Sequence, residues 1–231
     1  MKLASFRHMN QIGVGLILDD SCVVDLRRVL PNAPHDMVAL IEGGDTLIGT
    51  LRQEISKGFS SEAKLPLSSV ELLAPIPKPH RNVLCVGRNY KEHVAEGDRA
   101  QKKPTELPAY PQFFTKLPAT VIGPGSPIPS HADVTAQLDY EVELALVIGK
   151  TGRDIKPADA LDHVFGVSII NDVSARDLQR RHGQWFKGKS LDGSCPFGPW
   201  IVHRSAWQLS QGMRIELRVN GELRQSSARI R

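Results

Sequence analysis

The sequence predicts an α+β protein dominated by strands, with a small N-terminal unit and a larger second unit. Pro75, Pro77 and Pro79 fall within five positions, which indicates an extended connector because proline fixes φ and removes a hydrogen-bond donor. Before this connector both strand and helix patterns occur, and after it strand patterns prevail. The 231 residues suffice for two units. We therefore expect an N-terminal α+β domain at 1–73, a linker at 74–80 and a larger domain at 81–231.

The N-terminal unit has the patterns of two strands and two helices. Apolar segments at 12–18 and 22–26 flank a short polar turn and predict two strands. Two helices are expected at 36–41 and 46–57, the second ending at Gly58. This unit contains no cluster of chemically active residues, so we expect the functional site in the second unit.

The second unit contains one strong strand pattern and one strong hairpin pattern. Apolar residues alternate through 140–148, which predicts a strand with one apolar face. The dipeptide Asn220-Gly221 predicts a tight hairpin turn, because these residues accept the positive φ that such a turn needs. Ser174 is placed to cap a helix at 175–181. Further segments are expected as strands at 82–86, from 113 and at 164–170, as helical turns at 88–96, and as loops at 120–129 and 187–199.

Composition excludes several classes of protein. No apolar run approaches the ~18–20 residues that span a bilayer, and residues 1–7 lack the apolar stretch of a secretory signal. Cys22, Cys85 and Cys195 are widely spaced and odd in number, which argues against a disulfide framework or zinc site and favours a cytoplasmic location. The net charge of +4 is spread over short basic clusters. This pattern favours a solvated surface or small anionic substrates over nucleic acid.

Three carboxylates form the main candidate site. Glu141 and Glu143 lie two apart on a predicted strand, so their side chains share one face with Cα atoms ~6.5–7 Å apart. Asp172 follows the next strong strand, and a neighbouring strand ~4.8 Å away brings it within reach. Oxygen ligands without His or Cys suit Mg²⁺, Mn²⁺ or Ca²⁺. The alternative is that both glutamates form the solvated face of an amphipathic strand.

Residues 183–190 match the phosphate-loop pattern GxxxxGK[ST], but the context argues against nucleotide binding. A phosphate loop needs a buried strand before it and a helix after it. Here the preceding segment 175–182 is charged and helix-like, and the following segment 191–196 does not begin a helix. Cys195 likewise has no base at a sensible spacing, so we interpret it as a packing residue.

The order and spacing of five motifs over about residues 70–231 resemble the fumarylacetoacetate hydrolase superfamily. The resemblance implies a mixed-sheet β-roll preceded by a small N-terminal domain. It also implies an Mg²⁺- or Mn²⁺-dependent enzyme that cleaves, decarboxylates, hydrates or isomerises 2-oxo acids and β-dicarbonyl compounds, commonly as a dimer. The motifs are N-V-L-C-V-G-R-N-Y-K-E-H at 82–93, D-Y-E-V-E-L at 139–144, I-N-D-V-S-A-R-D-L-Q at 170–179, G-K-S at 188–190 and V-N-G-E at 219–222.

The resemblance also implies roles for individual residues. Residues three apart on a helical turn share a face, so the implied general-base pair is spatially consistent. A separate possibility for Arg176 is a structural ion pair with Asp177. The implied metal ligands are Glu141, Glu143 and Asp172; the implied catalytic residues are His93, Glu96 and Lys189; and the expected substrate-binding residues are Arg88, Tyr90, Lys116, Arg176 and Gln179.

We therefore expect a divalent-metal-dependent hydrolase or isomerase that acts on a small anionic 2-oxo or β-diketo acid through a metal-bound enolate. Arg88 stands near a position where true fumarylacetoacetases often have a carboxylate, which disfavours fumarylacetoacetate itself. The family normally continues past the hairpin with a glycine-rich segment, so a fragment or a partner-completed chain is expected. The alternatives are a hydratase, decarboxylase or lyase on the same substrates, an inactive truncated paralogue and, least favoured, a nucleic-acid-binding module.

Overall fold

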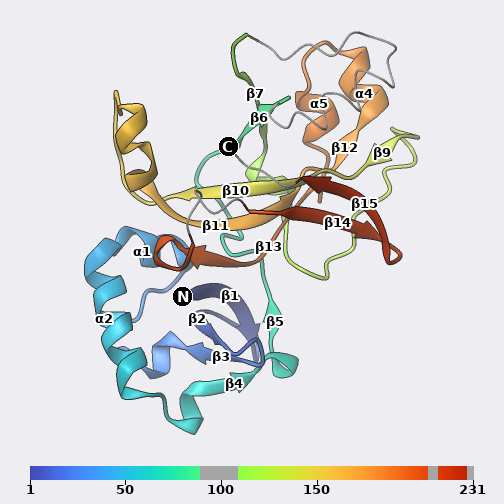
Figure 1. Cartoon of the computed structure of the whole chain (residues 1–231). Helices are drawn as coiled ribbons and strands as arrows, with labels where there is room; N and C mark the ends of the chain where they lie inside the picture. The colour runs from blue at the N-terminus through green and yellow to red at the C-terminus, as the bar shows by residue number, and fades with distance from the viewer. Residues whose placement is uncertain (89–108, 208–212, 228–231) are drawn as a thin grey trace.

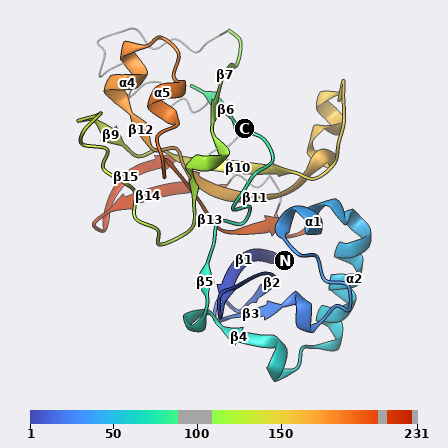
Figure 2. The same cartoon turned by 180° about the vertical axis from the view of Figure 1, so that it is seen from behind.

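The computed structural model describes residues 1–88, 109–207 and 213–227. Within these ranges, nine strands form one sheet whose main path runs β10-β11-β13-β1-β2-β3-β4. Strand β5 pairs with β1, and β8 pairs with β13 in parallel. Figures 1 and 2 show strands β1–β4 with helices α1 and α2 at one end of the molecule, and β6, β7, α4 and α5 at the other. The predicted strand-dominated α+β class is confirmed.

The bounds of the elements are as follows. The N-terminal strands are β1 (Lys2–His8), β2 (Gln11–Leu18), β3 (Cys22–Asp25), β4 (Lys64–Pro66) and β5 (Glu71–Leu72). The later strands are β6 (Val83–Gly87), β7 (Gln112–Lys116), β8 (Val121–Ile122), β9 (Leu138–Asp139), β10 (Val142–Ile148), β11 (Val164–Asn171), β12 (Ser174–Ala175), β13 (Cys195–His203), β14 (Ile215–Val219) and β15 (Glu222–Ser227). The α-helices are α1 (Met37–Glu42), α2 (Gly44–Lys57), α4 (Arg176–Arg181) and α5 (Phe186–Lys189). Short 3₁₀ helices occupy Leu26–Arg28, Ser61–Ala63, Leu67–Ser69, Pro118–Thr120, Pro157–His163 and Arg204–Ala206.

Local sequence signals explain the ends of several elements. Helix α1 begins after Asp36, whose carboxylate accepts a hydrogen bond of 2.8 Å from the Ala39 amide. Helix α2 ends at Gly58, which has a φ of 79°. Asn220 and Gly221 both have positive φ and connect β14 to β15, so the predicted hairpin is confirmed. Strand β1 was not predicted from the sequence.

One sheet and one core extend across the predicted domain boundary. Strand β13 pairs antiparallel with β1, with Lys2 opposite Val202. The Ser5 hydroxyl donates a hydrogen bond of 2.7 Å to the Pro75 carbonyl inside the predicted linker. The principal apolar core contains Leu3 and Leu40 from before the linker together with Phe165 and Ile201 from after it. The boundary at 74–80 therefore separates segments that share a sheet, and its role as a boundary between folding units stays a prediction.

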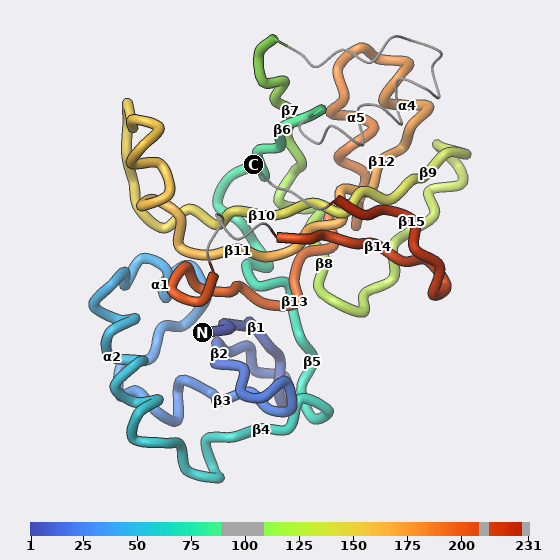
Figure 3. Tube along the Cα trace, viewed as in Figure 1, coloured from blue at the N-terminus to red at the C-terminus, as the bar shows by residue number. Residues whose placement is uncertain are grey.

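Strand β10 departs from the simple alternation expected for it. Val142 and Val147 are buried, whereas Leu146 is 46% and Ile148 is 61% exposed. The two buried valines are five residues apart and therefore lie on opposite faces of the strand, and the pairing with β11 shifts only beyond them, between Val147 and Ile148. Hairpin β14–β15 lies beside the beginning of β10, as the tube in Figure 3 shows. This end of β10 is therefore held between β11 and the hairpin.

Candidate functional site

The register between β10 and β11 brings Glu141 and Asp172 together. Val142 lies opposite Asn171, and the Asp172 amide donates a hydrogen bond of 2.7 Å to the Glu141 carbonyl. The two carboxylate residues therefore face each other where the paired strands end. This confirms the expectation that Asp172 follows a strand adjacent to the one bearing the glutamates.

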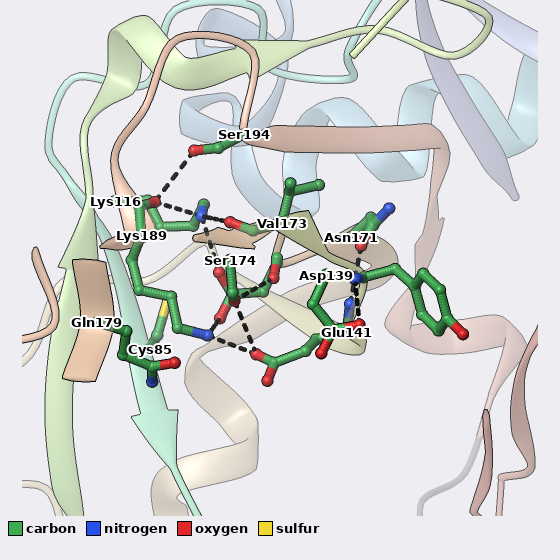
Figure 4. Close-up of polar contacts among 12 residues, drawn as sticks. Cys85, Lys116, Asp139, Glu141, Asn171, Val173, Ser174, Gln179, Lys189 and Ser194 are labelled. Atoms are coloured by element: carbon green, nitrogen blue, oxygen red, sulfur yellow. Dashed lines mark hydrogen bonds and ion pairs between the residues drawn. The ribbon is translucent and has the colours of Figure 1, made fainter. Parts of the chain in front are cut away.

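The ammonium group of Lys189 lies between these two carboxylates. Figure 4 shows the Lys189 side chain pointing toward Glu141. Its Nζ atom is 2.6 Å from Oδ2 of Asp172 and also donates to Oε2 of Glu141. The Lys189 side chain is almost fully buried, and Nζ lies 4.9 Å from the centre of the Phe114 ring. The sequence predicted a catalytic contact with substrate for Lys189, whereas here its ammonium contacts the predicted metal ligands.

Lys116 is a buried counter-ion of Asp172. Its side chain is 0% exposed, and Nζ lies 2.8 Å from Oδ1 of Asp172. The same ammonium donates to the carbonyl oxygens of Val173, at 3.1 Å, and Lys189. An ammonium has three donors, and all three are used here. A contact between Lys116 and a substrate carboxylate stays a prediction, and no local sequence pattern indicated that this lysine is enclosed.

Arg176 fixes the other side of Glu141. The guanidinium contacts Glu141 Oε1, and its Nη2 lies 2.8 Å from Oδ2 of Asp139. Its Nη1 donates to the Gln179 side-chain oxygen at 3.1 Å. Asp177 instead accepts hydrogen bonds from Thr135 Oγ1 and the Leu178 amide. The carboxylates that Arg176 contacts are thus Asp139 and Glu141, in place of the considered ion pair with its sequence neighbour.

The charges around Glu141 determine its ionisation. Burial opposes the charged form of this carboxyl, but the positive charges of Lys189 and Arg176 outweigh burial and hold its pKa below the usual value. Glu141 is therefore ionised at neutral pH, which is the state that a cation ligand requires.

Several residues that hold the glutamate segment in place were missed as site residues. The Asn171 side-chain oxygen accepts a hydrogen bond of 3.0 Å from the Glu141 amide. The Gln225 side chain accepts from the Val142 amide at 2.9 Å and donates to the Tyr140 carbonyl at 3.1 Å. Asn171 precedes a predicted ligand and so was within reach of sequence reasoning. Gln225 lies 83 positions from Val142, and no local pattern links the two.

Ser174 has a different role from the predicted helix cap. It belongs to strand β12, and helix α4 begins after Ala175 without a side-chain cap. Its hydroxyl lies 2.9 Å from the Asp172 carbonyl oxygen and 3.3 Å from Oε2 of Glu141. Because β12 pairs with β9, this segment is extended, and the Ser174 hydroxyl points toward Glu141 instead of capping the helix.

The carboxylates suit a hard divalent cation, although Lys189 now sits between two of them. Glu143 lies on β10 opposite Ile170 and lines the same cleft as Glu141 and Asp172. Among the described residues, no three His, Cys, Asp or Glu side chains converge closely enough to form a metal cluster. Two carboxylates nevertheless already share one cationic group, the Lys189 ammonium, and oxygen-only donors favour Mg²⁺ or Mn²⁺. The three-ligand set stays a prediction that this donor chemistry supports.

The site opens into a broad cleft with a volume of about 1910 Å³. Its walls include exposed apolar side chains of β6 and β10, such as Leu84 and Ile148. Tyr90, His93 and Glu96 lie outside the described residues. The predicted site residues that line the cleft are Arg88, Glu141, Glu143, Asp172, Arg176, Gln179 and Lys189.

The cysteines near the site are not activated thiols. Burial raises the pKa of Cys85 to about 12 and that of Cys195 to about 11, so both thiols are protonated at neutral pH. Cys195 is fully buried in the principal core, which confirms the packing role predicted for it.

Residues 183–190 lack the strand–loop–helix context of a phosphate loop, as the sequence predicted. Helix α4 precedes this segment, and helix α5 lies within it.

The sequence model described as "Fumarylacetoacetate (FAA) hydrolase C-terminal" matches residues 82–229. The chain belongs to the fumarylacetoacetate hydrolase superfamily. It is 46% identical over 240 residues to oxaloacetate tautomerase YisK of Bacillus subtilis, covering 99% of this chain and 78% of that protein. It is 37% identical to the mitochondrial oxaloacetate tautomerase Fahd2a of Rattus norvegicus, covering 98% of this chain and 70% of that protein.

Solved structures agree with this assignment. A fumarylacetoacetate hydrolase from Exiguobacterium antarcticum has a TM-score of 0.78 and 42% identity, covering 99% of this chain and 75% of that one. A maleylpyruvate hydrolase from Sphingobium in complex with manganese(II) and pyruvate has a TM-score of 0.75 and 26% identity, covering 99% and 76% of the two chains. The predicted family and fold are thereby confirmed.

In the described part of the chain, no helix has the length and apolar character that crossing a membrane requires.

Proposed function

We propose that this chain catalyses the keto–enol tautomerisation of a small anionic 2-oxo acid, with oxaloacetate as the first candidate. The observation that carries this proposal is the 46% identity to an oxaloacetate tautomerase over 99% of the chain. The site supports it, because a tautomerase must stabilise negative charge on an enolate oxygen and move a proton. Cationic side chains and carboxylates of opposite charge meet at the cleft, where such a substrate fits.

A divalent cation would supply Lewis acidity here, polarising the 2-oxo group and lowering the energy of the enolate. Glu141, Glu143 and Asp172 are the residues proposed to hold it. Asn171 and Arg176 orient Glu141, and Lys116 orients Asp172, so the carboxylates are positioned in advance. Mg²⁺ and Mn²⁺ both suit this donor set.

The proton transfer is assigned to His93 and Glu96 on the basis of the family resemblance. On a helical turn, a carboxylate three residues from a histidine can accept a hydrogen bond from the imidazole ring. This hydrogen bond fixes the tautomer of the imidazole and raises the basicity of its other nitrogen. In a tautomerase the imidazole removes a proton from carbon and returns it to the enol oxygen, or the reverse. Water does not enter this reaction as a nucleophile.

Hydrolysis of a carbon–carbon bond is the second candidate. It is favoured by the 42% identity to the fumarylacetoacetate hydrolase from Exiguobacterium antarcticum. The same enolate would then be the leaving group, and water activated by the base would attack the neighbouring carbonyl carbon. The two functions therefore differ in what the base acts on.

The deciding experiment offers the purified protein oxaloacetate and an acylpyruvate in the presence of MnCl₂. Decay of the oxaloacetate enol absorbance faster than in buffer, without pyruvate formation, supports tautomerisation. Cleavage of the acylpyruvate into two acids, detected by NMR, supports the hydrolase instead. Turnover of neither substrate contradicts both.

The variant Glu143→Ala tests the metal site directly. We expect loss of Mn²⁺ binding in calorimetry and a fall in turnover of more than about 100-fold, because even changes outside the ligand shell cost about 10–100-fold. Glu62→Ala is the matched control, since Glu62 is exposed in the N-terminal region. Full activity of Glu143→Ala would contradict the metal-dependent mechanism.

Homodimer formation, which the family resemblance implies, stays a prediction that size-exclusion chromatography can test.

A further inference from the structure

Lys189 occupies the position at which two of the proposed ligands would share a metal ion. Its ammonium contacts Oε2 of Glu141 and lies 2.6 Å from Oδ2 of Asp172. The other oxygen of Asp172 is already bound to Lys116 at 2.8 Å. The oxygens that face each other across the site are therefore both engaged by the same internal cation.

A divalent ion and this ammonium exclude one another. Mg²⁺ binds oxygen ligands at roughly 2.0–2.1 Å, so an ion shared by the two carboxylates would lie close to the present position of Nζ. Two positive charges that near each other repel strongly in a buried site. The Lys189 side chain is only 3% exposed, so little water is present to screen them.

We propose that Lys189 is an exchangeable internal counter-ion: it holds Glu141 and Asp172 together, and its ammonium must leave these oxygens before a divalent cation binds. This inference rests on the proposed metal-dependent function and concerns how the site is loaded. It predicts that Lys189 weakens metal binding, although it belongs to the site.

The structure allows the side chain to move while the backbone stays fixed. The Lys189 carbonyl accepts hydrogen bonds from Lys116 Nζ and, at 3.1 Å, from Ser194 Oγ. Gly188 packs against helix α4 so closely that a Cβ atom there would lie 2.6 Å from the Gln179 amide nitrogen. The long lysine stem has several rotatable bonds, so its ammonium can change position without movement of the main chain.

Displacement of the Lys189 ammonium by a metal ion would change how the site interacts with an anionic substrate. Among the described residues, three cations and three carboxylates form ion pairs with one another at the site, so the charges of these six side chains balance. When a metal ion takes its carboxylates, the Lys189 ammonium loses its counter-charges at the wall of the cleft. A buried charge without a partner is costly, so an anionic substrate becomes the natural partner for it. The members of the group are Lys116, Arg176, Lys189, Asp139, Glu141 and Asp172.

The test is calorimetric titration of MnCl₂ into chelator-treated wild type, Lys189→Met and Lys187→Met. Lys187 is exposed on the same short helix, so its variant removes an equal charge without touching the carboxylates. We expect Lys189→Met to bind Mn²⁺ at least tenfold more tightly than wild type, with Lys187→Met unchanged. Lys189→Arg, which keeps a cation at this position, should not gain affinity.

A second readout covers the case in which Lys189→Met is unstable without metal. Its thermal melting temperature should be lower than that of wild type in chelator and should rise more on addition of MnCl₂. Equal or weaker Mn²⁺ binding by Lys189→Met, with binding intact in wild type, overturns the counter-ion inference and leaves the proposed function standing. Absence of Mn²⁺ binding in both proteins overturns the proposed function itself.

Discussion

The N-terminal sheet and the cleft of this protein are held together in contrasting ways. Around β1–β3 most of the buried side chains are apolar, with Leu3, Phe6 and Leu40 completely enclosed, and the buried polar ones there are Ser5 and Asp25. At the cleft the enclosed side chains include Lys116, Asp172 and other charged groups that contact each other. Apolar burial stabilises in proportion to the area removed from water. An enclosed ion group stabilises only while every charge keeps its partner. The contrast shows that one region of the sheet is stabilised mainly by apolar burial and the other by ion pairs that depend on one another.

The largest expected effect follows from removing the charge that both lysines share. Asp172→Asn leaves Lys116 and Lys189 without a common carboxylate, and breaking a buried pair in this way costs about 3–5 kcal/mol. Urea unfolding monitored by circular dichroism measures the loss. Asp133→Asn, at an exposed position, should change the free energy of unfolding by less than about 0.5 kcal/mol. A similarly small change for Asp172→Asn would contradict the view that the ion group is interdependent.

A cavity in the apolar core should affect stability alone. Leu40→Ala removes a fully buried side chain of helix α1, at an expected cost of about 2–5 kcal/mol in urea unfolding. Mn²⁺ affinity of the folded variant should equal that of wild type, because no group at the cleft changes. Leu223→Ala is the control, since Leu223 lies at the surface with 45% of its area exposed. A matching fall in Mn²⁺ affinity for Leu40→Ala would show that the two regions are energetically coupled.

His203 ends strand β13, where this strand contacts the start of the chain. Burial is the main cause that lowers its pKa from 6.5 to about 4, and its ring packs 5.0 Å from that of Phe165. His203 binds a proton more readily in the unfolded chain than in the folded one. The contribution of His203 to the free energy of unfolding is therefore full above pH 6.5 and declines as the pH falls toward 4. The decline is at most about 3 kcal/mol.

The measurement for His203 is urea unfolding at pH 7 and pH 4.5 for wild type and His203→Gln. The variant should lose less stability between these pH values than wild type does. His35→Gln serves as control, because the His35 side chain is 84% exposed. An identical pH dependence for wild type and His203→Gln would assign the acid sensitivity to other groups.

Local patterns predicted much of the fold because they reflect local physics. Strands β2 and β3, helices α1 and α2 and hairpin β14–β15 lie close to the predicted ranges, since periodicity, caps and turn residues act over a few positions. Strand β1 was missed because Leu3, Ala4, Ser5 and Phe6 are all buried, so no alternation marks it.

The candidate site was predicted in outline but not in its contacts. Spacing placed Glu141 near Asp172, since strand pairing follows simple geometry. It did not show that Lys116 is enclosed or that Lys189 bridges the acids, because burial depends on segments distant in sequence. The burial of Ser174 and the role of Gln225 have the same origin.

Strand β13 connects the start of the chain to the cleft. At one end, the His203 amide donates a hydrogen bond of 2.9 Å to the Met1 carbonyl, and Lys2 and Leu3 pair with the strand. Just before its other end, Ser194 donates to the carbonyl of Lys189. Trimming the first eight residues would therefore remove a hydrogen-bonded neighbour from both β13 and β2, and β13 begins one residue after Ser194, which binds the Lys189 peptide. The first residues of the chain are thus joined through a single strand to the peptide of Lys189.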